Sequence, residues 1–175
     1  MKQVFLWVCL AAAMQTGAQV KSVKQVTDMC TQTTAGVTKT LGAGYWKIES
    51  QAKLDTLYYI RWMPKKLDNK NMGQMVMCFY KQKDKPCDFL VFQTLDKGFY
   101  DRAKAEMLKG GYKPGKTEDK KNEKKEYFSD GKFDITVTQV RQTDTGPLQY
   151  VFGARPEVKT TVAGGKGAVG KGVKR

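Results

Sequence analysis

The chain contains no histidine, and this absence narrows the chemistry that its side chains can perform. Histidine is the usual general base near neutral pH, and it completes the Ser-His-Asp and Cys-His arrangements of nucleophilic catalysis. Ser22, Ser50 and Ser129 are the only serines, and none lies in a sequence context that activates a nucleophile. From the sequence we therefore assign no catalytic residue, no metal ligand and no cofactor.

Carboxylates are the remaining groups that could act as acids and bases. Glycoside hydrolysis needs two of them at a defined separation, which a sequence does not determine. A small carboxylate-dependent secreted hydrolase is therefore kept as an alternative function. The acids that lie in or beside expected strands are Glu49, Asp55, Asp88, Asp134 and Asp144.

Residues 110–117, GGYKPGKT, match the phosphate-loop pattern G-x-x-x-x-G-K-[ST]. That loop binds phosphate because a buried strand precedes it and a helix N-terminus follows it. Here an expected helix precedes the match, and a lysine-rich segment without large apolar residues follows. We interpret Gly110 and Gly111 as a helix stop and exclude nucleotide binding.

Cysteine spacing indicates a disulfide. Cys78 and Cys87 flank a charged turn, so they face each other if the two flanking strands form a hairpin in the right register. Pairings that involve Cys30 remain open, because an odd number of cysteines follows residue 18.

Two segments carry residues typical of binding surfaces. Tyr58, Arg61 and Trp62 combine aromatic rings with a cation on one expected strand, although alternate residues of a strand often fill a core instead. A glycine-rich tail, residues 157–175, is expected to be disordered and basic, and could attract polyanions such as lipopolysaccharide or simply aid solubility. Its cations include Lys166, Lys171, Lys174 and Arg175.

The N-terminus resembles a secretory signal peptide over residues 1–18. Lys2 precedes an apolar run over residues 4–14, and small residues end at Ala18, where we expect cleavage. No later stretch is apolar enough to cross a membrane. We therefore expect an exported protein, periplasmic or extracellular. Its net charge of +14 favours anionic partners, of which nucleic acid is the least expected.

The central run from residue 88 to 112 predicts a buried strand followed by a helix. Phe89 to Phe92 form a short apolar run, and then Phe99, Ala103 and Met107 recur at helical spacing. Asp96 is the expected N-cap of this helix. Residues 20–41 show a second helical pattern, and residues 113–126 have the composition of a solvated loop.

These elements predict an α+β domain over residues 19–156. An antiparallel sheet of about six strands is covered on one face by two helices. The order helix, three strands, helix, three strands suggests a tandem α-β-β-β duplication with halves at residues 20–94 and 95–156. The predicted function is non-catalytic binding of a protein or an anionic envelope component, with a structural or assembly subunit of the envelope as a further alternative.

Overall fold

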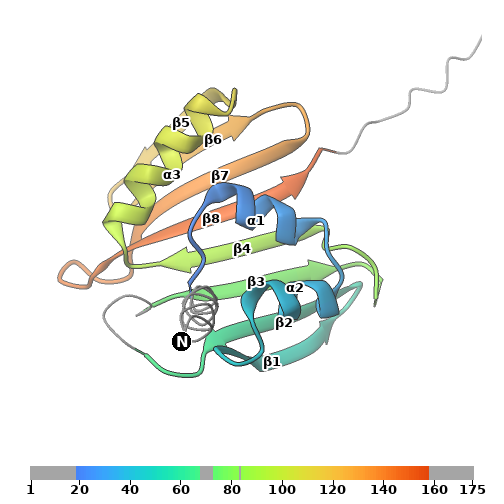
Figure 1. Cartoon of the computed structure of the whole chain (residues 1–175). Helices are drawn as coiled ribbons and strands as arrows, with labels where there is room; N and C mark the ends of the chain where they lie inside the picture. The colour runs from blue at the N-terminus through green and yellow to red at the C-terminus, as the bar shows by residue number, and fades with distance from the viewer. Residues whose placement is uncertain (1–18, 68–72, 83, 158–175) are drawn as a thin grey trace, which may run out of the picture.

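Eight antiparallel strands form one sheet in a computed structural model that describes residues 19–67, 73–82 and 84–157 (Figure 1). The strand order is β1-β2-β3-β4-β8-β7-β6-β5, so each half of the chain is a meander and the two meanders meet at β4 and β8. The strands are β1 (Trp46–Leu54), β2 (Leu57–Pro64), β3 (Met75–Tyr80), β4 (Phe89–Thr94), β5 (Lys113–Lys120), β6 (Glu123–Ser129), β7 (Phe133–Arg141) and β8 (Leu148–Pro156).

Three helices, α1 (Val23–Cys30), α2 (Thr34–Leu41) and α3 (Lys97–Lys109), cover one face of the sheet (Figure 1). The helix predicted over residues 20–41 is therefore two shorter helices. The helical conformation is interrupted between them because threonine side chains form hydrogen bonds with nearby backbone groups. Thr31 donates to the Asp28 carbonyl, and Thr33 accepts from the Gly36 N–H as the N-cap of α2.

The α+β class is confirmed, but the predicted numbers of strands and helices are wrong. The sheet has eight strands rather than six, and the described residues contain three helices rather than two. The largest error concerns residues 113–126, which form most of the β5–β6 hairpin instead of a solvated loop. This hairpin is held by ladder hydrogen bonds and by the alignment of opposite charges, so it needs few apolar residues.

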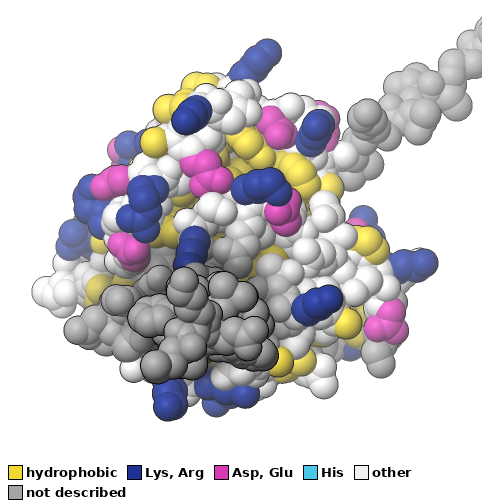
Figure 2. Space-filling view, viewed as in Figure 1, with side chains coloured by type: hydrophobic (Ala, Val, Ile, Leu, Met, Phe, Trp, Pro, Cys, Tyr) yellow, Lys and Arg dark blue, Asp and Glu magenta, His cyan; other side chains and the backbone are white. Residues whose placement is uncertain are grey.

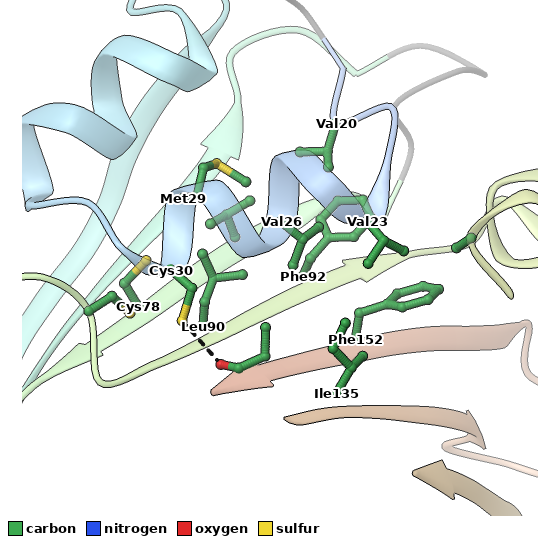
Figure 3. Close-up of a cluster of buried hydrophobic side chains, with 14 of the residues drawn as sticks. Val20, Val23, Val26, Met29, Cys30, Cys78, Leu90, Phe92, Ile135 and Phe152 are labelled. Atoms are coloured by element: carbon green, nitrogen blue, oxygen red, sulfur yellow. Dashed lines mark hydrogen bonds between the residues drawn. The ribbon is translucent and has the colours of Figure 1, made fainter. Parts of the chain in front are cut away.

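The core lies between the helices and the inner face of the sheet. Phe92 and Phe152 face each other across β4 and β8, and Phe99 of α3 packs edge-on against both rings, at centroid distances of 5.0 and 5.2 Å. Helix α1 lies over the same two strands, and its valines point into this cluster (Figure 3). Both halves of the sheet therefore share one core.

Helix α3 ends as the sequence predicts. The Tyr112 N–H donates to the Met107 carbonyl and the Gly111 N–H donates to the Leu108 carbonyl, which together form a Schellman motif. Gly111 has a φ of +85°, the left-handed conformation that glycine adopts without strain. Asp96 occupies the N-cap position, but its side chain pairs with Arg102 and accepts no hydrogen bond from the backbone N–H groups of the first turn.

One carboxylate links the helices of the two halves. Glu106 on α3 accepts hydrogen bonds from the backbone N–H groups of Val23 and Lys24, at 2.9 and 3.0 Å. These groups belong to the first turn of α1, where helices leave N–H groups without internal partners. Each half consists of a helical segment and four strands, one strand more than predicted; duplication of a common unit stays a prediction.

Both edge strands are irregular. In β1 the register with β2 shifts between Ile48 and Ser50, and in β5 the register with β6 shifts between Pro114 and Thr117. Such bulges bend an edge strand and interrupt its row of free backbone groups.

Candidate binding face

The outer face of the sheet, which we call the open face, is packed against none of the described helices. On β3 and β4 every second residue is fully buried under the helices, while the residues between them are half-buried on the open face. The apolar side chains of the open face gather on β2, β3 and β4. They include Tyr59, Met63, Met75, Met77, Phe79, Phe89 and Val91.

Three aromatic rings form a ladder across these strands. The ring centroids of Tyr59 and Phe79 are 6.4 Å apart, and those of Phe79 and Phe89 are 5.8 Å apart. Strand register explains the ladder, because Tyr59 faces Phe79 across β2 and β3, and Phe79 faces Phe89 across β3 and β4. Directly opposed aromatic side chains stabilise a sheet and hold each other in place.

The ladder ends at a cation on β8. The Arg155 guanidinium lies 5.5 Å from the centroid of the Phe89 ring, within the range of a cation–π contact. Gly153 makes room for this arrangement, because a Cβ at that position would lie 2.9 Å from the Phe89 ring. The Phe89 ring therefore packs closely over Gly153 of β8, beside Arg155.

A hollow of about 430 Å³ continues from this end of the ladder over β8, β7, β6 and β5. Phe89, Gly153 and Tyr127 supply its apolar surface, while Lys113 and Arg155 supply positive charge. Asp134, which faces Arg155 across β7 and β8, is the carboxylate of the hollow. The hollow joins aromatic surface to exposed cations.

Glu49 and Glu118, two other carboxylates on the open face, already form ion pairs within the chain. Glu49 accepts a hydrogen bond of 2.7 Å from Arg61, which lowers the pKa of that carboxyl below its ordinary value. Lys116 likewise lowers the pKa of Glu118 through a hydrogen bond. Among the described residues, Lys113 and Arg155 take part in no ion pair, so their charges are available to a partner.

The three residues predicted from β2 do not lie on one surface. Arg61 lies on the open face, whereas Trp62 is 0% exposed and donates from Nε1 to the Thr38 hydroxyl of α2. Tyr58 lies on the helix side of the sheet with Lys53 over its ring. Trp62 is therefore a core residue, because successive residues of a strand point to opposite faces.

Sequence reasoning missed the ladder. Tyr59, Phe79 and Phe89 stand in phase with Arg61, and their strands show the period of two that places alternate residues on one face. That signal was present in the sequence. The strand order that aligns the three rings was not.

The other predicted binding and disulfide residues have different outcomes. The tail cations Lys166, Lys171, Lys174 and Arg175 lie outside the described residues. Cys78 and Cys87 are buried free thiols here, together with Cys30, and their pairing stays a prediction.

The carboxylates considered for hydrolysis lie on separate elements. Glu49 is on β1 beside Arg61, Asp88 precedes β4 and pairs with Lys81, and Asp134 is on β7. In the part of the chain that the structure describes, no group of three or more His, Cys, Asp or Glu residues is arranged to hold a metal ion. Within the same residues, no helix has the length and apolarity needed to cross a membrane.

Comparisons of the chain with protein-family models, curated proteins and solved structures find no match.

Proposed function

We propose that this chain is an exported, non-catalytic binding protein whose open face binds another protein. The partner's binding surface combines apolar side chains with carboxylates. The observation that carries the proposal is the ladder of Tyr59, Phe79 and Phe89, which ends at the exposed Arg155 and is left uncovered by the described helices.

The composition of the open face favours a protein over a small ligand. Aromatic residues, methionine and arginine are enriched at the centres of protein interfaces. Here Met75 and Met77 flank the aromatic rings, and methionine side chains adapt readily to a partner's shape. The hollow is broad and opens directly onto the aromatic ladder, which suits an inserted side chain or loop of a partner.

Charge specifies the partner further. The chain carries a net charge of +14, and Lys113 and Arg155 stand at the hollow without an ion-pair partner among the described residues. A surface of this sign accelerates encounter with acidic proteins and disfavours basic ones. A partner that places an aspartate or glutamate in the hollow and an apolar side chain over the ladder satisfies both features.

Binding selection from a displayed library of random peptides tests this proposal, with the purified chain as bait. We expect enriched peptides to combine acidic residues with large apolar residues. Phe79→Ser and Arg155→Glu should each weaken binding of a selected peptide at least tenfold, which corresponds to about 1.4 kcal/mol. Fluorescence anisotropy of the labelled peptide measures this change.

Leu108→Ser is the matched control, because Leu108 is 54% exposed on α3, on the helix side of the molecule. It should leave peptide binding unchanged, and circular dichroism should show that all three variants are folded. Equal binding by folded Phe79→Ser and wild type would refute the proposed face. If the chain selects no peptide but is retained on immobilised lipopolysaccharide in a salt-sensitive way, an anionic polymer replaces a protein as the partner.

A further inference from the structure

The hollow on the open face has an ordered floor, which two neighbouring rows of residues form across the second half of the sheet. Strand register places Tyr127, Thr136 and Gly153 in one row, from β6 through β7 to β8. Phe89 extends this row from β4, because its ring lies so close over Gly153 that an added Cβ would meet it at 2.9 Å. An aromatic side chain therefore stands at each end of the row, with the short side chain of Thr136 between them.

The space above Thr136, which we call the slot, suits a third aromatic ring. Neighbouring strands lie about 4.8 Å apart, so β8, under the Phe89 ring, and β6, which carries Tyr127, are separated by about 9.6 Å. A ring inserted above β7 fits between the other two at the centroid distances that aromatic pairs prefer, about 4.5–7 Å. Phe89, Thr136 and Tyr127 are half-buried, so part of each side chain is accessible to a ligand.

Cations hold both rings that flank the slot. The Arg155 guanidinium lies 5.5 Å from the centroid of Phe89, and the Lys116 ammonium lies 4.8 Å from the centroid of Tyr127. Such contacts restrict the rings before a ligand arrives, which lowers the entropy that binding costs.

The second row supplies the charge of the hollow. It consists of Lys113, Ser129, Asp134 and Arg155, which face one another in turn across β5, β6, β7 and β8. Both cations and the carboxylate between them are exposed. Two positive charges and one negative charge line the hollow, so its net charge is +1. One carboxylate balances this charge, whereas a phosphate group or a polyanion exceeds it and is repelled by Asp134.

We infer that the hollow binds one aromatic side chain of the partner together with one carboxylate next to it in the partner's sequence. The inference rests on the proposed function, because it names what the partner protein inserts beside the aromatic ladder. Phe89 and Tyr127 contact the inserted ring, and Thr136 sets the size of the slot. Lys113 and Arg155 pair with the carboxylate.

Nuclear magnetic resonance titration of the isotope-labelled full chain with N-acetylphenylalanine tests the inference, because this probe carries one ring and one carboxylate. We expect saturable shifts of the amide signals of Ser129, Thr136 and Gly153, with a Kd on the order of 1 mM. N-acetylphenylalanine amide lacks the carboxylate and N-acetylleucine lacks the ring, so each should bind at least about threefold more weakly. Phenyl phosphate, with its second negative charge, should also bind more weakly than the acid.

Thr136→Leu should fill the slot and weaken binding of N-acetylphenylalanine at least about tenfold. Thr138→Leu is the matched control, because Thr138 lies two residues further along the same face of β7 and is not among the described residues that line the hollow. It should leave binding unchanged. Lys113→Gln should narrow the preference for the acid over its amide, which identifies the partner of the carboxylate. Circular dichroism establishes that each variant is folded.

Equal affinity for the acid and its amide, or for the phenylalanine and leucine probes, would overturn the inference. These comparisons use the wild-type chain, so they do not depend on the folding of any variant. Cations and carboxylates are interspersed over the helix side of the molecule (Figure 2). Shifts spread over that side, with none in the hollow, would show attraction by net charge alone and would equally reject the inference.

The results also separate this inference from the proposed function. If N-acetylphenylalanine does not bind but selected peptides need Phe79, the proposed face stands and the assignment of the hollow fails. If the probe binds in the hollow as expected but Phe79→Ser leaves peptide binding unchanged, the hollow keeps its assignment and the proposed face fails.

Discussion

The two halves of the molecule share a topology but differ on the open face. On β2, β3 and β4 this face is aromatic and methionine-rich, whereas on β5 and β6 it carries lysines and glutamates. Strands β2, β3 and β4 of the first half are held by burial on one face and by aromatic contacts on the other. The β5–β6 hairpin relies on ladder hydrogen bonds and ion pairs, since no residue of β5 is fully buried. One fold thus tolerates two kinds of stabilisation.

Phe99→Ala should have the largest effect, because it removes the ring that joins the halves. Phe99 packs against Phe92 of the first half and Phe152 of the second. We expect a loss of about 3–5 kcal/mol in the free energy of unfolding. Urea denaturation measures it, with Leu108→Ala on the same helix as the exposed control. A loss below about 1 kcal/mol would mean that the halves do not share a core.

Gly153→Ala tests how the two halves pack on the open face, where β4 meets β8. The added Cβ would meet the Phe89 ring, and we expect a loss of about 1–3 kcal/mol from overpacking. Gly115→Ala is the matched control in the second half, because its Cβ would meet only ordinary contacts with Tyr127, the nearest at 3.5 Å. Equal melting temperatures of the two variants would contradict the close packing of Phe89 over β8.

Glu126→Gln probes how the second half uses charge. Burial opposes ionisation of Glu126, but hydrogen bonds from Lys104 and Tyr100 lower its pKa below the ordinary value of 4.5. A lowered pKa stabilises the folded chain above pH 4.5, and this contribution is lost as the pH falls through the folded-state pKa. At pH 7 we expect the variant to lose about 1–2 kcal/mol.

The pH dependence separates this role from a packing defect. The difference in unfolding free energy between wild type and Glu126→Gln should shrink as the pH falls below 4.5. A difference that stays constant down to pH 3 would assign the loss to packing.

Glu118→Gln should have the smallest effect. The carboxylate pairs with Lys116 at the solvent-exposed edge of the sheet, where ion pairs contribute little, so we expect a smaller change in the free energy of unfolding than for any variant above. Thermal unfolding in low and high salt measures it. A larger loss would show that charge pairing, rather than ladder hydrogen bonding, holds the hairpin.

Segments with strong apolar periodicity were predicted well. The strand at Phe89, the following helix and its stop at Gly111 all appear as expected, because local residues alone specify them. Residues 113–126 were missed, since partner strands rather than their own apolar content make them strands. The same limit applies to Trp62 and Tyr59, whose opposite faces depend on where the helices dock.

The bulged edges of the sheet limit how this chain can assemble. Free backbone groups on an edge strand invite another strand to pair, which leads to extended, fibre-like assemblies. Here β1 and β5 both carry register shifts, and Pro114 on β5 lacks an N–H group. Neither edge strand offers a regular template for pairing with a further strand. Association of this chain with a partner should therefore proceed by contact between side chains. Concentrated samples should resist polymerisation by edge-to-edge pairing of strands.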